Sequence, residues 1–261
     1  NTPGTDSDVL SFLNAASITN TTQQTAINNL VVGLKSNMLW DKMLAIYPYV
    51  GGTDVQHSYN LKSPSSFQLS WSTGITHSAN GVYVSGYTSY GDTGATMVGL
   101  GLTQSETSIG TYIVDWTTNQ SMTSGVYGQE VAGGSNILGN ALAIWQSAGN
   151  YYFLIGNWYQ NANTPKTSEG FIQASRSSNT QIISKQHDGS IITTTPSTVS
   201  SAYPDNTTGR SVLVLSSNRI NSVTRLSTHK FQYFGKKLTS TELDTMYTIV
   251  QAYQTELGRQ A

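Results

Sequence analysis

Short apolar runs of strand length recur from residue 43 to residue 235, and they constrain the fold more than any other feature of the sequence. The runs are rich in the β-branched and aromatic residues that favour strands, and clusters of Gly, Asn and Ser separate them. The first run is 43–52, and the others are 67–71, 81–86, 95–102, 108–116, 124–131, 141–147, 151–157, 169–176, 181–186, 190–195, 211–217 and 227–235. This spacing predicts antiparallel sheets in a β-sandwich, and no repeat of roughly 20–50 residues points to a solenoid or propeller.

Two of the turns between these runs predict hairpins. Residues 147–150 ("SAGN") join two apolar runs, and Asp188-Gly189 joins 181–186 to 190–195. Asp-Gly pairs suit the left-handed backbone of a tight hairpin turn. Local strand pairing is therefore expected in the middle of the chain.

Two helices are predicted before residue 43. Cap-type residues open the stretch 6–16, whose apolar residues follow at helical spacing. In 20–35, Thr21 and Gln24 fit a capping box. One face of that helix carries Ile27, Leu30, Val31 and Leu34. The stripe predicts a helix that packs on the sandwich.

A third helix is predicted at the end of the chain. Thr239 can cap it with Glu242 three residues later, and Gly258 is placed to end it. Its apolar face carries Leu243, Met246, Tyr247, Val250, Gln254 and Leu257. Such a face must cover apolar side chains, either on the sandwich or on the N-terminal helices.

The segment that leads into this helix has a recognisable pattern. In "FQYFGKKLTSTEL" (231–243) an aromatic strand ends in Gly and a Leu-Thr-x-x-Glu segment opens a helix. This resembles the closing strand of concanavalin A-like, laminin-G-type jelly rolls; the matching residues are Gly235, Leu238, Thr239 and Glu242. The resemblance implies an all-β, concanavalin A-like jelly-roll β-sandwich flanked by N-terminal helices and a C-terminal helix.

Two longer stretches carry a second resemblance. Residues 21–64, which contain Tyr-Pro-Tyr-Val-Gly-Gly, and 243–259, which contain Tyr-Gln-Thr-x-Leu-Gly-Arg, are similar to a module of bacteriophage and prophage virion proteins of the fibre or tail type. We expect residues 1–42 to form a helical segment, 43–238 the sandwich and 239–261 the C-terminal helix of the same domain. The match covers about a quarter of the chain at its two ends, and residues 65–230 resemble nothing beyond a strand pattern.

Charge and composition exclude several classes of partner and of site. The formal net charge is −1 and the 13 basic residues are scattered, so no basic stripe is available to bind nucleic acid. No apolar run approaches the roughly 20 residues that a membrane-spanning helix needs, and we expect no membrane insertion. The lack of cysteine excludes disulfides and thiolate sites. Because the chain begins at Asn1, we expect a processed product or a fragment.

Carboxylates give no catalytic pattern. Retaining glycoside hydrolysis needs two carboxyl groups roughly 5–5.5 Å apart, which one strand would supply at i and i+2 or i+4. Asp6 and Asp8 are the nearest pair, but their place before a helix favours capping. Four others stand alone in the sequence: Glu106, Asp115, Glu130 and Glu169. We therefore predict no catalytic residues and no enzyme, with a glycan depolymerase on the same fold as the alternative.

Histidines and turn carboxylates give no metal pattern. The four histidines form no HxH or HExxH motif and are interpreted as ordinary polar residues: His57, His77, His187 and His229. The loops 90–94 and 203–209 contain calcium-type ligands, but Asp, Asn and Gly are what any turn uses. No phosphate-binding glycine motif follows a strand. We predict no metal and no cofactor.

Aromatic and amide side chains are the remaining signal. Sugar rings stack on Trp and Tyr, and their hydroxyls pair with amides. The stretch 157–163 is predicted to be a loop whose contact residues are Trp158, Tyr159, Gln160, Asn161 and Asn163. Tyr87 and Tyr90 form a second candidate. The alternative is that Trp158 is a core or intersubunit residue.

These observations and the resemblance together imply a function. We expect a non-enzymatic protein of the virion surface, on a tail, fibre or head appendage, that adheres to a glycan of the host surface. Assembly would take place in the host cytoplasm, and by analogy with fibres we expect a homotrimer that contacts neighbouring virion proteins and a bacterial surface polysaccharide. Repeated weak sites would give multivalent binding. A purely structural virion protein is the alternative.

Overall fold

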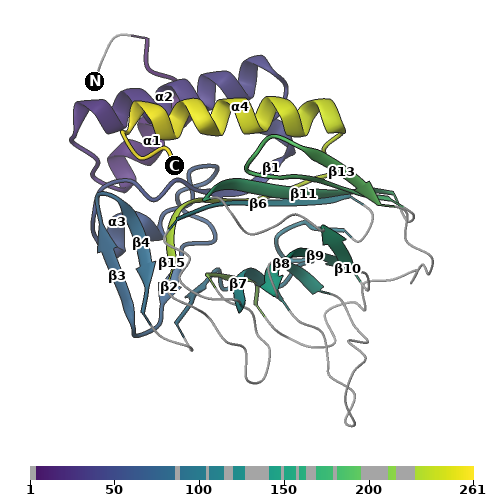
Figure 1. Ribbon diagram of the computed structural model, residues 1–261. Helices are drawn as coiled ribbons and strands as arrows, with labels where there is room; N and C mark the ends of the chain where they lie inside the picture. Colours follow the sequence, from purple (N-terminus) through teal and green to yellow (C-terminus); the bar gives the residue numbers. More distant parts are fainter. Residues whose placement is uncertain are drawn as a thin grey trace.

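The fold consists of three layers: a layer of helices, a first antiparallel sheet and a second antiparallel sheet (Figure 1). The protein is seen in a computed structural model that describes residues 4–85, 89–103, 106–114, 120–126, 141–147, 150–156, 159–162, 169–178, 181–194, 211–215 and 227–261. The first sheet lies in the middle, so both of its faces are covered. The predicted antiparallel β-sandwich with flanking helices is confirmed at this level.

The first sheet has the strand order β13-β12-β11-β6-β15-β4-β3, and β1 pairs with β15 beside this path. Its strands are β1 (Met43–Tyr47), β3 (Ile75–Ser78), β4 (Gly81–Val84), β6 (Thr107–Val114), β11 (Gly170–Ser178), β12 (Gln181–Lys185), β13 (Ile191–Thr194) and β15 (Ser227–Gly235). All of the pairs are antiparallel. The predicted hairpin at Asp188-Gly189 is confirmed, because β12 and β13 pair across it.

The second sheet has the order β10-β9-β8-β7-β14-β5-β2. Its strands are β2 (Ser70–Trp71), β5 (Gly91–Asp92), β7 (Gln120–Val126), β8 (Ala141–Ser147), β9 (Asn150–Gly156), β10 (Tyr159–Ala162) and β14 (Leu213–Val214). The hairpin predicted at 147–150 is confirmed, because Ser147 pairs with Asn150. The strand predicted at 95–102 is wrong. The chain turns there with Gly101 at φ +82°, and three backbone hydrogen bonds close back onto Thr96, Met97 and Val98.

Burial on both faces explains why the central strands read as continuous runs. All eight residues of β6 are buried. Ile109 and Ile113 pack between the two sheets, whereas Tyr112 and Val114 pack under the helices. Gly110 gives room on the helix side, because a Cβ there would lie 2.3 Å from Cε1 of Tyr233. A strand buried on both faces has no polar side, so alternation is lost.

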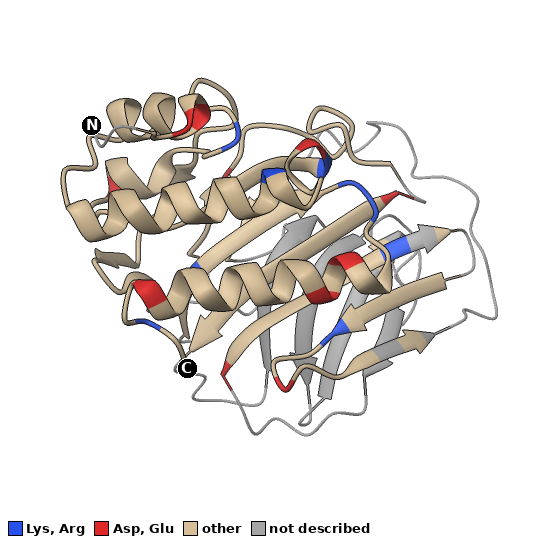
Figure 2. Cartoon of the chain, turned by 90° about the horizontal axis from the view of Figure 1, so that it is seen from above, with Lys and Arg blue, Asp and Glu red and all other residues tan. Residues whose placement is uncertain are grey.

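The helical layer consists of α1 (Ser7–Ala15), α2 (Thr21–Ser36) and α4 (Ser240–Glu256), with a short turn η1 (Trp40–Lys42) leading into β1. Seen from above, α2 and α4 run across the first sheet, and their charged residues sit mostly near the helix ends (Figure 2). The predicted Thr21 capping box is wrong: the N-cap of α2 is Asn20, whose side chain accepts a hydrogen bond from the amide of Gln23. Asn caps better than Thr, which explains the earlier start.

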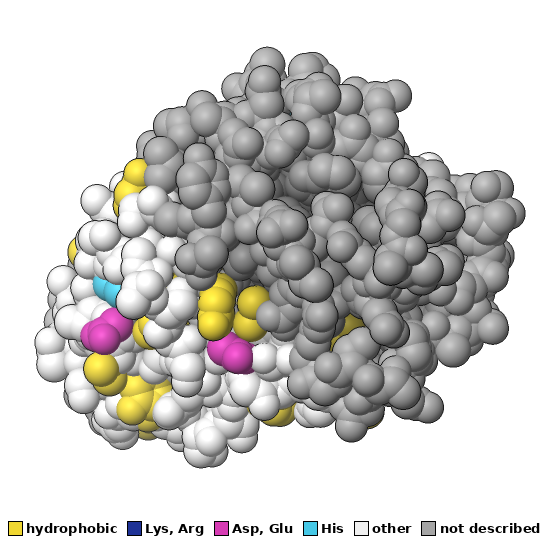
Figure 3. All heavy atoms as spheres, turned by 90° about the horizontal axis from the view of Figure 1, so that it is seen from below, with side chains coloured by type: hydrophobic (Ala, Val, Ile, Leu, Met, Phe, Trp, Pro, Cys, Tyr) yellow, Lys and Arg dark blue, Asp and Glu magenta, His cyan; other side chains and the backbone are white. Residues whose placement is uncertain are grey.

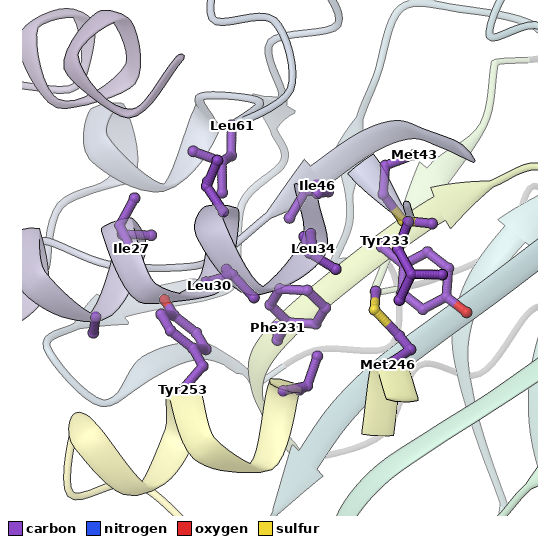
Figure 4. Packing of buried hydrophobic residues seen from close by; sticks show 14 of the residues in the cluster. Ile27, Leu30, Leu34, Met43, Ile46, Leu61, Phe231, Tyr233, Met246 and Tyr253 are labelled. Carbon is purple, nitrogen blue, oxygen red and sulfur yellow. The ribbon is translucent and has the colours of Figure 1, made fainter. Parts of the chain in front are cut away.

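Aromatic packing joins α4 to the first sheet. Figure 4 shows Leu30 of α2, Phe231 of β15 and Tyr253 of α4 facing one another. The rings of Phe231 and Tyr253 meet edge to face with centroids 6.0 Å apart. The predicted capping box at Thr239 and Glu242 is confirmed, and Gly258, at φ +65°, ends the helix as expected. Full burial of each such ring stabilises the fold by about 1.5–3 kcal/mol.

Arg259 fastens the end of the chain to the turn that follows β1. Its Nη1 donates to the carbonyl of Tyr49 at 2.8 Å, and its Nη2 donates to the carbonyl of Lys230 at 3.1 Å and more distantly, at 3.4 Å, to that of Pro48. The hydroxyl of Tyr253 also donates to the Pro48 carbonyl, at 2.9 Å. The two stretches that resemble virion proteins therefore contact each other through these side chains, which we call the Arg259 clamp.

Candidate functional site

Among the described strands, β2 ends the second sheet and β3 ends the first. The short helix α3 (Asp54–Ser58) packs against both of these strands. Four rings meet there, from the turn after β1, from α3, from β2 and from β3: Tyr49, His57, Trp71 and His77. We call these four residues the edge cluster.

The rings of the edge cluster are in contact in a closed circuit. The centroids of Trp71 and His77 lie 4.8 Å apart and edge to face, and those of His57 and His77 lie 5.2 Å apart. The ring of Tyr49 lies 5.9 Å from that of His57 and 6.3 Å from that of Trp71. Tyr49 and His57 are buried, whereas Trp71 and His77 are partly exposed. The cluster therefore has a buried back and an accessible front.

Local structure explains how the cluster is held. Thr53 caps α3 by accepting a hydrogen bond from the amide of Gln56, and the Asp54 carbonyl accepts one from Trp71 Nε1 at 2.9 Å. Trp71 lies close over Gly91 of β5, where a Cβ would be 2.6 Å from the indole ring. Glycine is required at that position because the indole ring lies against the backbone.

The two histidines share one hydrogen bond. Nδ1 of His57 and Nδ1 of His77 lie 3.0 Å apart. Burial, with smaller effects from His77 and Arg259, lowers the pKa of His57 to about 3. Burial also lowers the pKa of His77, against the opposing effect of Asp54. Both rings are therefore neutral at pH 7, and one Nδ1–H donates to the other Nδ1.

Two buried polar atoms of the edge cluster have no hydrogen-bond partner: the hydroxyl of Tyr49 and Nε2 of His57. A buried polar group without a partner costs about 1–3 kcal/mol. Such atoms are places where an ordered water, an ion or a ligand group can supply the missing partner. Among the residues that the structure describes, no three His, Cys, Asp or Glu side chains lie close enough to hold a metal ion.

The structure only partly covers the contact residues predicted from the sequence. Trp158, Asn163 and Tyr87 lie outside the described residues. The loop predicted at 157–163 is wrong in its described part, because Tyr159, Gln160 and Asn161 belong to strand β10, which pairs with β9. The amide-rich sequence suggests a loop, but the backbone ladder of β9 extends the sheet at its edge.

The second predicted stretch lies near the other side of the same sheet. Tyr90 is 36% exposed, and its amide and carbonyl pair with Ser72, next to β2. Five strand-to-strand steps separate β10 from β5, which Tyr90 precedes. At roughly 4.8 Å a step this is about 24 Å. The two predicted stretches therefore do not form one monosaccharide-sized site.

Three of the carboxylates singled out from the sequence, Asp6, Asp8 and Glu106, form ion pairs with lysines. Asp6 caps α1, as expected, and with Asp8 it binds Lys35. Glu106 pairs with Lys237, which lowers the pKa of Glu106. Asp115 and Glu130 lie outside the described residues. In the loop 90–94, Asp92 accepts a hydrogen bond from the Gly94 amide, as in an ordinary turn, and 203–209 is outside the described residues.

Sequence reasoning missed the histidine pair. His57 and His77 are 20 residues apart, on a helix and a strand, and no spacing motif links them. The other two histidines lie elsewhere: His187 is in the β12–β13 turn, and His229 is buried beside Ser227 and Thr111. Burial lowers the pKa of His229 to about 3. Only the fold of β2, β3 and α3 could have revealed the pair.

Comparisons with known proteins show the fold. No family model and no curated protein matches the chain. A mutant of Trypanosoma rangeli sialidase that displays trans-sialidase activity has a similar structure, with a TM-score of 0.57 and 10% identity over 88% of this chain. The match spans 39% of that sialidase's length. Domain 4 of an extracellular GH43 arabinanase from Geobacillus stearothermophilus, in complex with arabinotriose, has a TM-score of 0.37 and 10% identity, covering 79% of this chain and 98% of that one.

These similarities correct one expectation. We expected no enzyme, yet the structure with a TM-score of 0.57 is a mutant sialidase that displays trans-sialidase activity. The expectation of no enzyme is therefore withdrawn, and at 10% identity the match shows the fold alone. It does not test the expected virion role, which stays a prediction. Among the described helices, none is long and apolar enough to cross a membrane.

Proposed function

We propose that this chain is a carbohydrate-binding β-sandwich of a glycan-processing protein, and that sugar binds at the edge cluster. The observation that carries the proposal is the pairing of accessible and buried groups there. Trp71 and His77 are partly exposed, and two polar atoms behind them lack partners. A concanavalin A-like jelly-roll arrangement of the two sheets is part of the same proposal.

The chemistry of the edge cluster suits a sugar ring. The apolar C–H face of a sugar packs on an indole ring, while its hydroxyls need directional donors and acceptors. His77 supplies the ring nitrogen that does not face His57, and the exposed Asp54, whose charge acts on His77, supplies a carboxylate. The similarity to a sialidase supports the proposal, because a related fold occurs in a protein that processes glycans.

Affinity electrophoresis tests the proposal. The purified chain is run through gels that contain different polysaccharides, and the release of reducing ends from each polysaccharide is measured in parallel. We expect retardation by at least one polysaccharide, weakened severalfold in Trp71→Ala and His77→Ala. His187→Ala is the matched control, because it removes a partly buried histidine far from the edge cluster.

Folding of each variant is checked by circular dichroism, since Trp71 also packs against Gly91. No retardation by any polysaccharide would overturn the proposal. Retardation that is equal in the chain, the edge-cluster variants and the control would place the binding site elsewhere. In that case the residues of β10, starting with Tyr159, become the first positions to substitute.

A virion-surface protein that recognises a host glycan is a second proposal. It is favoured by the Arg259 clamp, which joins the two stretches of the chain that resemble virion proteins. Light scattering should then give the mass of a homotrimer, and the protein should adsorb to intact bacterial cells. A monomer that ignores cells but binds isolated polysaccharide would count against this second role.

A further inference from the structure

The accessible front of the edge cluster faces negative charge, whereas the positive charge of Arg259 is buried behind it and acts on His57. Asp54 is exposed on α3, and its field opposes the lowering of the pKa of His77. Asp92 of β5 pairs directly with Ser70 of β2, next to Trp71, and its charge helps to raise the pKa of Tyr47. Both histidines of the cluster are neutral at pH 7. The accessible front therefore carries the Asp54 carboxylate and uncharged rings, while Asp92 adds negative charge on the other face of the neighbouring strand.

Five of the described basic residues are used elsewhere. Lys35, Lys42 and Lys62 pair with carboxylates in the helical layer or next to it. Lys185 binds Asp244 of α4, and Arg259 is buried in the clamp. Seen from below, the described part of the surface shows acidic side chains and a histidine beside exposed hydrophobic ones, and no Lys or Arg (Figure 3). Nothing in this part of the surface attracts an anion.

The unpaired atoms behind the rings add a second requirement. The Tyr49 hydroxyl can donate or accept, and Nε2 of His57 accepts when its Nδ1 carries the proton. A ligand with N–H or O–H donors can pair with these atoms only where it enters behind Trp71 and His77, because neither atom is exposed. A carboxylate brings only acceptors, and it would also face Asp54.

We infer that the edge cluster prefers glycans with amino groups over neutral glycans, and that it disfavours glycans with carboxylate groups. The inference rests on the proposed glycan-binding function and names its substrate class. An ammonium beside Asp54 is attracted, whereas a carboxylate is repelled. For an exposed charge pair the expected difference is about two- to fivefold in affinity at each step. The sialidases that share the fold do not set the ligand, because function depends on the site and not on the fold.

The test uses three polysaccharides as named probes in the same gel system: chitosan, dextran and alginate, which are cationic, neutral and carboxylated. We expect the strongest retardation by chitosan and the weakest by alginate, with Trp71→Ala reducing the effect of chitosan. Asp54→Asn should bring chitosan close to dextran. Asp54→Lys should reverse the order, so that alginate retards the protein most.

Asp41→Lys is the matched control for net charge. Its carboxylate is 97% exposed and lies near the helical layer, away from α3. The order of the three polysaccharides should stay unchanged in this variant. The same reversal in Asp41→Lys would show a nonspecific charge effect and overturn the inference.

The remaining outcomes separate the inference from the proposed function. Equal retardation by all three polysaccharides, or the strongest by alginate, overturns the charge preference and leaves glycan binding in place if Trp71→Ala still weakens it. No retardation by any of the three, or by any other polysaccharide, overturns the proposed function and the inference with it.

Discussion

The Arg259 clamp and the edge cluster both bury polar groups, and they treat these groups in opposite ways. In the clamp, each donor of Arg259 and Tyr253 finds a carbonyl or amide oxygen. In the edge cluster, the Tyr49 hydroxyl and His57 Nε2 find none. The hydrogen-bond donors of the clamp are all satisfied within the protein, whereas the edge cluster keeps two unpaired polar atoms that a ligand can satisfy.

Tyr49 connects the two regions. Its carbonyl is held by Arg259, and its ring belongs to the edge cluster. Its φ of 47° is a left-handed conformation that a bulky residue adopts only when its surroundings hold it there. The clamp therefore directs the Tyr49 ring toward His57 and Trp71. The helical end of the chain thus positions the back of the candidate site.

The largest loss of stability should come from truncating the buried ring of Phe231, which packs against Tyr253 of the Arg259 clamp. Phe231→Ala should destabilise the fold by about 3–5 kcal/mol, because the side chain is fully buried between α2, α4 and the first sheet. Trp71→Ala, in the partly exposed front of the edge cluster, should cost less. Urea unfolding measures both. An equal or larger loss of stability in Trp71→Ala would contradict the contrast between the buried region around the Arg259 clamp and the partly exposed edge cluster.

The next effect tests whether the clamp positions the site. Arg259→Ala should lower the unfolding free energy by about 3 kcal/mol, because it leaves several buried carbonyls without donors. It should also weaken glycan binding, since the Tyr49 carbonyl loses its hydrogen bond to Arg259 and the Tyr49 ring is no longer held in place. Arg259→Lys is the control, since it keeps the charge but cannot form the same fork of hydrogen bonds. Intact glycan binding in a folded Arg259→Ala variant would separate the two regions.

Acid should act on buried histidines before it acts on carboxylates. The folded pKa of His57 and His229 is about 3, below the unfolded value of 6.5, so the unfolded chain binds more protons as pH falls below 6.5. Stability should therefore fall between pH 6.5 and 4.5, by roughly 1 kcal/mol per pH unit for each group. His57→Gln should remove one group's share of this slope. Urea unfolding at several pH values measures it, and an unchanged slope would contradict the burial of neutral His57.

The sequence predicts the layers better than the site, and the reason is physical. The stripes of α2 and α4, the Thr239 cap and Gly258 are local patterns, and each appears in the structure. The Asn20 cap and strand β10 were misread because Asn and Gln serve both loops and ordered backbone. The edge cluster joins four residues from separate elements, so no local pattern could announce it. Gly91, which makes room for the Trp71 ring, is the residue whose identity reflects the cluster.

The smallest effect gives the sharpest comparison, because one chemical change is made in each region. Tyr253→Phe removes a hydroxyl that donates to the Pro48 carbonyl, and should cost about 1 kcal/mol. Tyr49→Phe removes an equally buried hydroxyl that has no partner. It should leave the unfolding free energy unchanged or raise it by up to about 1 kcal/mol, since a desolvated group is lost without a bond. Matched urea titrations of the two variants decide the sign.

Glycan binding gives a second comparison of Tyr49→Phe with Tyr253→Phe. Tyr49→Phe should weaken binding to the polysaccharide that retards the protein, because bound ligand would give the buried, unpaired hydroxyl a partner, while Tyr253→Phe should leave binding nearly unchanged. A variant that is more stable but binds less is the signature of a polar group kept for a ligand at the expense of the fold. If Tyr49→Phe instead destabilises the protein as much as Tyr253→Phe does, the Tyr49 hydroxyl has a hydrogen-bond partner in the fold. The edge cluster would then be a structural element like the Arg259 clamp.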